Sequence, residues 1–293
     1  MLGEIRGEVR FKEPLSFHTS LRIGGPADIF IVPQDVEDIR LALSFAEREQ
    51  LSLDVIGGGN NLLVSDRGVR GVVLKLEGCL GRAEFNGEEA VAGAGVSLSA
   101  LIREAAALNL GGIECLVGVP ATVGGAVAMN AGTQDGGIAD FISAVYFLYP
   151  DGTLGEFKPG NGSYSYDVFT PPAKSVLIGA RLQLHRRPFA EIQKDIKQRL
   201  KQKKSTQPLA LASVGCVWKN PPGETATRLI EKVGLKGKRL NGAEISAKHA
   251  NFIVNRGGAA ASDIKVLMQL TLDRVRNHFG ITLEPEMKTM GEI

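Results

Sequence analysis

A run of three glycines and two asparagines, set between two apolar segments, constrains the fold of this chain more than any other feature. The run reads Ile56-Gly57-Gly58-Gly59-Asn60-Asn61-Leu62. The flanking apolar residues predict two buried strands, and glycine at their junction allows positive φ and a close approach to a ligand. Successive N–H groups in such a loop can converge on a phosphate. From the residues alone, a glycine-rich hairpin without a ligand is an equal alternative.

A second stretch of small residues lies near the middle of the chain. It contains Gly118, Val119, Pro120, Ala121, Thr122, Gly124, Gly125 and Ala126, followed by Asn130, Ala131 and Gly132. Small side chains at this density let backbone approach a flat ligand, although tight helix packing would need the same residues. A third stretch, Gly93-Ala94-Gly95, lacks the next glycine of a dinucleotide loop because Leu98 stands there. We expect it to be a turn before a helix over 98–109 that Ser97 caps.

Composition excludes several classes of protein. The chain has 293 residues with 34 Lys+Arg against 32 Asp+Glu, and a net charge of +2 argues against a nucleic-acid binder. Its three cysteines are far apart and odd in number, which indicates neither a disulfide framework nor a metal site. No stretch predicts a signal peptide or a membrane helix. We therefore expect a cytoplasmic protein without a metal, a membrane segment or a nucleic-acid partner.

The hydrophobic pattern predicts two domains. A strand at 29–32, a helix capped by Asp35 and the strand before the glycine loop form a βαβ start. Residues 186–204 hold eight Lys or Arg against two acids at helical spacing, which indicates a solvated helix face or, less simply, a phosphate contact at its end. From residue 207 the elements become short and proline-rich. We predict domains over 1–187 and 188–293, with a helix over 224–233 and another that Ser262 caps.

The glycine loop resembles the pyrophosphate loop of the FAD-binding fold shared by vanillyl-alcohol oxidase and p-cresol methylhydroxylase. It is more similar still to that loop in the UDP-N-acetylenolpyruvoylglucosamine reductase family, and similar pieces continue from about Thr19 to Gly291. The resemblance implies an α+β fold, with a two-part FAD-binding domain followed by a small α+β substrate domain. It also implies that the two glycine-rich stretches named above, from Ile56 to Leu62 and from Gly118 to Gly132, bind FAD without a covalent bond.

The resemblance singles out two catalytic residues. The segment Ala212-Ser213-Val214-Gly215-Cys216-Val217-Trp218-Lys219-Asn220-Pro221 is similar to the family's Ala-Gly-Ser-x-Phe-Lys-Asn-Pro motif, in which the serine donates a proton. Cys216 takes the place of that serine, and a thiol is the stronger acid of the two. The close of the chain, Leu283-Glu284-Pro285-Glu286, places the family's catalytic glutamate on Glu286. Without the resemblance, Cys216 is an ordinary small buried residue and Glu284 is as good a candidate as Glu286.

Matching segments imply a set of substrate-binding residues and one departure from the family. The implied residues are Tyr166, Lys204, Gly215, Lys219, Asn220, His249 and Asn251. The departure is Asp167, which stands where the family has an arginine. If the reaction is kept, another cation must substitute, and Lys219, Arg22 and Lys174 are the nearest candidates by motif. Taken alone, His249 is a structural residue as readily as a ligand-binding one.

The activity implied by the resemblance is the NADPH-dependent reduction of UDP-N-acetylglucosamine enolpyruvate to UDP-N-acetylmuramate, a step of peptidoglycan precursor synthesis. A monomeric oxidoreductase with small-molecule partners is expected. Two alternatives remain at this point. One is an FAD-dependent oxidoreductase of the same fold acting on another substrate, and the other is a flavin-binding paralogue whose site has decayed at Asp167.

Overall fold

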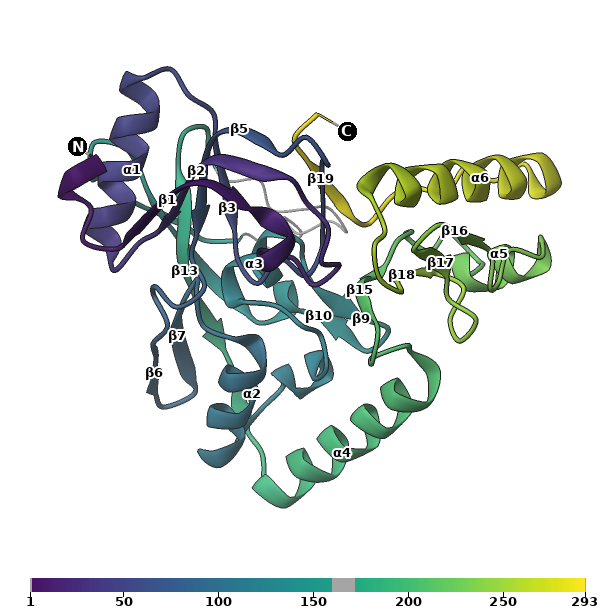
Figure 1. The fold of residues 1–293 in the computed structure, drawn as a ribbon. Coiled ribbons are helices and arrows are strands. Elements are labelled where there is room, and N and C mark those ends of the chain that lie inside the picture. The colour runs from purple at the N-terminus through teal and green to yellow at the C-terminus, as the bar shows by residue number, and fades with distance from the viewer. Residues whose placement is uncertain (1, 160–171, 293) are drawn as a thin grey trace. The chain divides into compact units, whose positions relative to one another are not determined.

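The protein, described here from a computed structural model, forms two compact units (Figure 1). The structure describes residues 2–159 and 172–292. Unit 1 takes its residues from the segments 1–11, 29–58 and 71–202, and unit 2 from 12–28, 59–70 and 203–293. Each unit thus draws on several segments of the chain, and the chain passes from unit 1 to unit 2 inside the glycine loop. The predicted domain boundary between residues 187 and 188 stays a prediction.

The first sheet of unit 1 carries the glycine loop at the end of one strand. Its strand order is β1 (Glu8–Pro14), β2 (Pro26–Val32), β5 (Val69–Lys75) and β3 (Leu53–Ile56). Helix α1 (Val36–Arg48) connects β2 to β3, and β3 runs parallel to β5. The carboxylate of Asp35 accepts hydrogen bonds from the N–H groups of Glu37 and Asp38, so the predicted cap is confirmed.

The second sheet of unit 1 has five antiparallel strands and supports the second glycine-rich stretch. Its strand order is β12 (Leu154–Phe157), β11 (Ile142–Leu148), β13 (Val176–Gln183), β7 (Glu89–Gly93) and β6 (Ala83–Asn86). Helix α2 (Leu98–Ala107) follows the Gly93–Gly95 turn as expected, and the short helix α3 (Val123–Ala128) packs on β13 and β7. The smaller elements of the unit are β8 (Leu110–Gly111), β14 (His185–Arg186), β9 (Gly132–Thr133), β10 (Gly136–Gly137), and the 3-10 turns η1 (Leu2–Glu4), η3 (Ile113–Leu116) and η4 (Ile138–Asp140).

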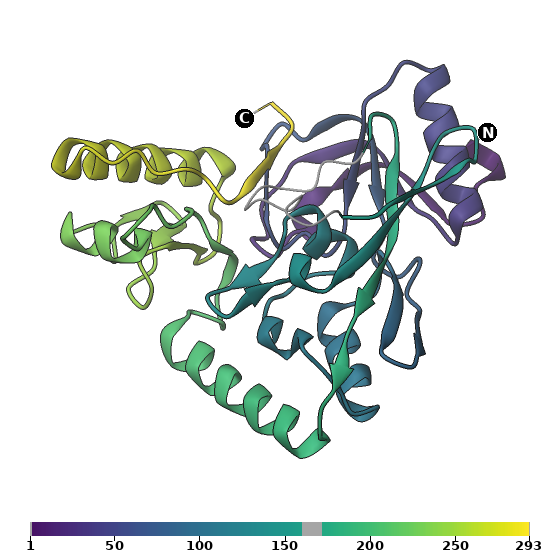
Figure 2. The same cartoon turned by 180° about the vertical axis from the view of Figure 1, so that it is seen from behind.

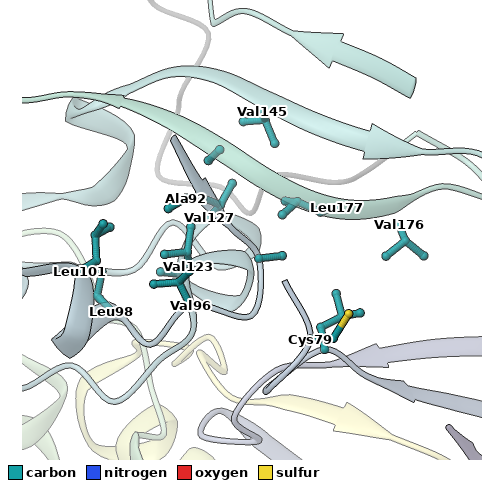
Figure 3. Packing of buried hydrophobic residues seen from close by; sticks show 14 of the residues in the cluster. Cys79, Ala92, Val96, Leu98, Leu101, Val123, Val127, Val145, Val176 and Leu177 are labelled. Atoms are coloured by element: carbon teal, nitrogen blue, oxygen red, sulfur yellow. The ribbon is translucent and has the colours of Figure 1, made fainter. Parts of the chain in front are cut away.

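A hydrophobic core joins these helices to the sheet in unit 1. Figure 3 shows Val123 and Val127 of α3 beside Ala92 of β7, with Leu98 and Leu101 of α2 nearby. All five side chains are fully buried. Burying a valine or leucine contributes roughly 1.5–3 kcal/mol, so α3 is held firmly although it is only six residues long.

Helix α4 (Phe189–Thr206) is attached to unit 1 mainly by charged side chains. Arg187, just before the helix, donates to Asp195 at 2.7 Å and forms an ion pair with the buried Glu114. Further along, Arg199 pairs with Asp135. The structure describes α4 in full, and Ile192 is its only buried residue. This agrees with the solvated-face interpretation of the basic segment.

Unit 2 is a small α+β assembly that includes two segments from the N-terminal part of the chain. Its main sheet has the order β15 (Ala212–Cys216), β18 (Phe252–Asn255), β17 (Ala243–Ile245) and β16 (Arg239–Leu240), and the 3-10 turn η2 is Leu15–His18. Helices α5 (Ala226–Lys232) and α6 (Ala261–Phe279) lie side by side in both views (Figures 1 and 2). A separate parallel ladder joins β4 (Leu62–Val64) to β19 (Lys288–Met290).

The structure corrects one predicted capping bond and two predicted helix starts. The Ser97 side chain makes no capping bond, because its hydroxyl contacts the Ser99 hydroxyl at 2.9 Å instead. Helix α5 begins at Ala226, behind a Thr225 cap, rather than at 224. Helix α6 begins before Ser262, and its N–H groups at Ala261 and Ser262 donate to the carboxylate of Asp66 at 2.7 and 3.1 Å.

Candidate active site

The glycine loop presents backbone donors rather than side chains. In unit 1, a Cβ added at Gly57 would overlap the Thr122 hydroxyl, so the first glycine-rich stretch lies directly against the second. The N–H groups of residues 57–61 donate to no acceptor in the described part of the chain. Buried or partly buried N–H groups normally find partners. Among the described residues these N–H groups have no partner, and they lie in a glycine-rich turn. They are therefore suited to an anionic ligand such as a diphosphate.

The second stretch is fixed by its own hydrogen bonds and by the Gly93–Gly95 turn. The Thr122 hydroxyl accepts from the Gly125 N–H at 3.2 Å and so caps α3. The N–H of Gly124 donates to the Ala94 carbonyl at 2.9 Å, and a Cβ at Gly124 would lie 2.8 Å from that of Ala94. Glycine here permits close packing of the start of α3 on the Gly93–Gly95 turn.

The other end of the glycine loop belongs to unit 2 and meets the C-terminal segment. A Cβ at Gly59 would overlap the carbonyl oxygen of His18. The Asn61 side-chain amide donates to the Glu286 carbonyl at 3.1 Å, and the Asn61 carbonyl accepts from the Lys288 N–H at 3.0 Å. Asn61 is thereby bonded to the segment that carries the predicted catalytic glutamate.

Cys216 ends strand β15 at an irregular point of the sheet. It lies opposite Phe252 of β18, and the register shifts between Ser213 and Cys216. Gly215 takes a φ of +82°, a conformation that glycine adopts without steric cost. The residues after Cys216 are braced by Asn251, whose side chain accepts from the Trp218 N–H at 2.9 Å and donates to the Trp218 carbonyl at 2.8 Å. Both sides of the cysteine are thus held in place.

Glu286 lies beside Cys216 because two backbone segments run antiparallel. The Glu286 N–H donates to the Val217 carbonyl at 2.8 Å, and the Lys219 N–H donates to the Glu284 carbonyl at 2.9 Å. Partial desolvation by the surrounding protein raises the pKa of Glu286 above the ordinary carboxyl value, against the opposing charge of Lys219, although the residue is solvent-exposed. Glu284 is also exposed, by 73%, but it forms an ion pair with Lys219 at 3.5 Å. These surroundings distinguish the two glutamates.

The Cys216 thiol is protonated at neutral pH. Burial raises its pKa to about 12, the charge of Glu286 adds to the rise, and Lys203 opposes it. Cys79 and Cys115 in unit 1 also have pKa values raised by burial, to about 11. Protonation alone therefore does not distinguish Cys216. Cys115 likewise has a carboxyl group, Glu114, and a cation, Arg199, acting on it, so the feature that sets Cys216 apart is that it is only partly buried whereas the other two cysteines are buried.

Comparison with known proteins connects this geometry to a family. Residues 207–290 match the family described as "UDP-N-acetylenolpyruvoylglucosamine reductase, C-terminal domain", and residues 27–158 match "FAD binding domain". A UDP-N-acetylenolpyruvoylglucosamine reductase of Anaeromyxobacter sp. is 42% identical over 288 residues, which cover 98% of this chain and 90% of that protein. The chain belongs to the UDP-N-acetylenolpyruvoylglucosamine reductase family.

Two further relatives agree with this assignment. UDP-N-acetylenolpyruvoylglucosamine reductase 2 of Symbiobacterium thermophilum is 40% identical, over 97% of this chain and 93% of its own. The crystal structure of the reductase from Thermus caldophilus is 35% identical, with a TM-score of 0.82, and covers 98% of this chain and 99% of that one. The predicted α+β fold with an FAD-binding domain is confirmed, and this member of the reductase family is an FAD-dependent oxidoreductase.

The reductase-family resemblance named seven substrate-binding residues, and the structure describes six of them. Tyr166 lies outside the described residues, as does Asp167. The Asn220 side chain accepts from the Ala226 N–H at 3.0 Å, at the start of α5, and Asn251 braces Trp218 as described above. Both contacts are internal to unit 2. A contact of either residue with substrate stays a prediction.

Lys203 and Lys204, at the end of α4, have different surroundings. The Lys204 carbonyl accepts from the Lys248 ammonium at 2.6 Å, which fixes the end of α4 to the turn before β18. It is the neighbouring Lys203 whose charge acts on Cys216. Sequence reasoning placed a phosphate contact at this end of α4 and left the choice between Lys203 and Lys204 open, because the surroundings of each lysine follow from how α4 ends.

His249 is half-buried beside Phe252, with ring centroids 4.7 Å apart in an edge-to-face arrangement. Burial lowers its pKa, and its buried Nδ1 has no hydrogen-bond partner among the described residues. A neutral imidazole with an unsatisfied nitrogen can accept or donate one hydrogen bond, which keeps its predicted role open.

No group of three or more His, Cys, Asp or Glu residues able to hold a metal ion occurs within residues 2–159 and 172–292. In the same residues no helix is long and apolar enough to cross a membrane.

Proposed function

We propose that this chain is an NADPH-dependent flavoenzyme that reduces UDP-N-acetylglucosamine enolpyruvate to UDP-N-acetylmuramate in peptidoglycan precursor synthesis. Family membership over nearly the whole chain supports the proposal. The observation that carries it is the pairing of a protonated thiol, Cys216, with a carboxyl group of raised pKa, Glu286, on adjacent antiparallel segments.

The residues that would hold FAD fit a flat dinucleotide. Gly57 and Gly58 supply N–H groups without partners in the described chain, and the Thr122 hydroxyl, which caps α3 at Gly125, lies directly against Gly57. Bound FAD supplies the two-electron hydride chemistry of the reaction. The protein itself binds the diphosphate, keeps large side chains away from the flavin and positions the proton donor.

Cys216 delivers the proton that completes the reduction. A thiol with a pKa of about 12 remains protonated at neutral pH. Addition of hydride to the enolpyruvyl C3 leaves negative charge on C2 and the substrate carboxylate. Such a carbanion is far more basic than a thiolate, so the transfer from Cys216 Sγ to C2 is downhill. Lys203 lies close enough to stabilise the thiolate that results.

Glu286 and Lys219 hold the substrate carboxylate as charge builds on it. In its protonated form, which burial favours, Glu286 can donate a hydrogen bond to that carboxylate. Lys219, whose charge acts on Glu286, places a cation at the same position. Electrostatic stabilisation of developing charge is usually the largest single contribution to catalysis. We propose that Lys219 compensates for the arginine that Asp167 replaces.

The Lys174 candidate is used elsewhere. Its ammonium group pairs with Glu47 at 2.7 Å, and its side chain is 70% exposed. It therefore serves as a matched control for Lys219. We also propose that the enzyme is a cytoplasmic monomer acting only on small molecules. Three free cysteines support a reducing compartment, and sedimentation of the purified protein would test the monomeric state.

The decisive experiment follows the flavin absorbance of the purified holoenzyme. NADPH is added first, without oxygen, and should bleach the flavin band. The enolpyruvyl substrate is then added and should restore the band, with one equivalent of UDP-N-acetylmuramate detected by mass. Bleaching without recovery would contradict the proposed substrate. Failure to bleach with NADPH, while NADH succeeds, would correct the reductant.

A further inference from the structure

Arg22 occupies a strained backbone conformation at a hydrogen-bonded turn of unit 2. Its φ is +56°, in the left-handed region that disfavours any residue with a bulky side chain. The turn is closed by the Thr19 hydroxyl, which donates to the Ile23 carbonyl at 2.8 Å and accepts from the Ile23 N–H at 3.3 Å. Glycine or asparagine would adopt this conformation at lower cost, so the choice of arginine needs another explanation.

The residues on both sides of Arg22 prevent the turn from relaxing. Leu21 and Ile23 are 0% and 3% exposed and belong to the core of unit 2. The Leu21 carbonyl also accepts from the Asn255 side chain of β18 at 3.0 Å. Because its neighbours are held in the core, Arg22 is left on the surface, where it is exposed.

The same turn contacts both parts of the proposed site that unit 2 supplies. The Ser20 N–H donates to the carbonyl of Gly59, in the glycine loop, at 3.0 Å. The Ser20 hydroxyl donates to the carbonyl of Ser213, on the strand that ends at Cys216, at 2.7 Å. Arg22 is therefore two residues from a hydrogen-bonded junction between the loop and the strand.

The guanidinium of Arg22 makes no hydrogen bond or ion pair with any residue that the structure describes. Two other cations also have positive φ, and both are paired: Lys12 with Asp28, and Lys174 with Glu47. Arginine presents a planar fork of donors that matches phosphate oxygens in a bidentate way. An unpaired fork on a turn that is hydrogen-bonded to Gly59 of the glycine loop is suited to bind a phosphate group of a ligand.

We propose that Arg22 binds a diphosphate ester, and that the strain of its turn is retained to hold the guanidinium beside the glycine loop. The proposal rests on the proposed function, which offers two sources of that chemistry: the diphosphate of FAD and the diphosphate of the UDP-sugar. The hydrogen bonds of Thr19 and Ser20 fix the backbone that carries the arginine.

The test compares Arg22→Gly with Lys12→Gly. Both variants remove a cation from a positive-φ position, but Lys12 is 64% exposed and already paired. For each variant, flavin fluorescence of the diluted holoenzyme gives the Kd of FAD, and steady-state rates give KM and kcat for the UDP-sugar. Thermal unfolding gives Tm. Arg22→Gln keeps the side-chain length without the charge and replaces the glycine variant if that one does not fold.

The expected result for Arg22→Gly is a Tm that is unchanged or raised by up to about 4 °C, together with about tenfold weaker binding of one diphosphate ligand. A higher Kd for FAD identifies the cofactor as the ligand, whereas a higher KM with unchanged Kd and kcat identifies the substrate. Lys12→Gly should change neither constant. If Arg22→Gly and Arg22→Gln leave both constants unchanged, the proposal is overturned, even when wild-type protein reduces the substrate as proposed.

Discussion

The two units position their candidate residues in different ways. Unit 1 contributes backbone: Gly57 lies against Thr122 and Gly124 lies against Ala94, because each glycine lacks a side chain, and their positions follow from local turns and an adjacent core. Unit 2 contributes side chains that meet only through contacts between distant segments, such as Asn61 with Glu286 and Asn251 with Trp218. The comparison teaches that ligand binding and proton transfer depend on different kinds of structure, so substitutions should separate them.

The largest expected effect is on proton transfer. Cys216→Ala should leave NADPH reduction of the flavin near normal and slow reoxidation by the enolpyruvyl substrate by ~10²–10⁴-fold, because the proton donor is lost. Stopped-flow absorbance measures the two half-reactions separately. Cys216→Ser should retain far more activity than Cys216→Ala. Cys115→Ala, a buried cysteine of unit 1, is the control. If reoxidation is equally fast in Cys216→Ala, the thiol is only packing.

A substitution in the glycine loop of unit 1 should give the opposite pattern, with weaker FAD binding and unchanged proton transfer. Gly57→Ala places a Cβ against the Thr122 hydroxyl, which must move and disturb the facing backbone. We expect the Kd of FAD to rise about 100-fold, equivalent to ~2.7 kcal/mol, with a normal proton-transfer rate in protein saturated with FAD. Flavin fluorescence measures the Kd. Gly81→Ala, whose new Cβ would have only an ordinary contact at 3.6 Å, should bind FAD like wild type.

A smaller effect tests how unit 2 replaces the missing arginine. Lys219→Met should lower kcat/KM for the substrate by roughly 10–100-fold, because a cation is withdrawn from the developing carboxylate charge. Lys174→Met should be silent, since Lys174 is paired with Glu47 on the surface of unit 1. Steady-state kinetics with both variants decides between them.

Asp167 provides the complementary test of this idea. If Lys219 compensates, Asp167→Ala is mild. Suppose instead that wild-type flavin is reduced by NADPH but is not reoxidised by substrate, and that Asp167→Arg restores reoxidation. The compensation proposed here would then be wrong, and the chain would be a flavoprotein that has lost the reaction.

The smallest effect concerns the protonation of Glu286. Its folded-state pKa is raised, so the native protein binds more protons than the unfolded chain between the ordinary carboxyl pKa and the raised one. Stability therefore falls as pH increases through that window, and reoxidation slows as the carboxyl loses its proton. Glu286→Gln should remove both dependences, with Tm at pH 7 equal to or above wild type. A wild-type pH profile unchanged by Glu286→Gln would assign the titration to another group.

The sequence predicted the parts that depend on neighbours along the chain. The strands around the glycine loop, the Asp35 cap of α1 and the turn before α2 are all local, and all are confirmed. Ser97 occupies the N-cap position of α2 as predicted but makes no side-chain capping bond, and the cap assigned to Ser262 is wrong. Ser97 has a nearer hydroxyl partner, while the cap of α6 comes from Asp66, which no local pattern could reveal.

The candidate site shows the same limit. Motifs named Cys216 and Glu286, but not the antiparallel pairing that brings them together. Which of Lys203 and Lys204 contacts a phosphate stays a prediction, because the sequence does not reveal where the last turn of α4 points; in the structure it is the charge of Lys203 that acts on Cys216. Asn251 was named as a substrate contact, and its bonds to Trp218 show a bracing role that requires the folded sheet.

The parallel pairing of β4 with β19 has a consequence for the order of synthesis. Residues 62–64 leave the ribosome long before residues 288–290, their partners, exist. At ~5–20 residues per second, the interval is on the order of tens of seconds. During it the N-terminal segments of unit 2 have no completed partner, and Asp66 has no helix to cap. Strand β19, which is translated last, therefore completes the pairing of β4. A nascent chain stalled before β19 would be the species most in need of a chaperone.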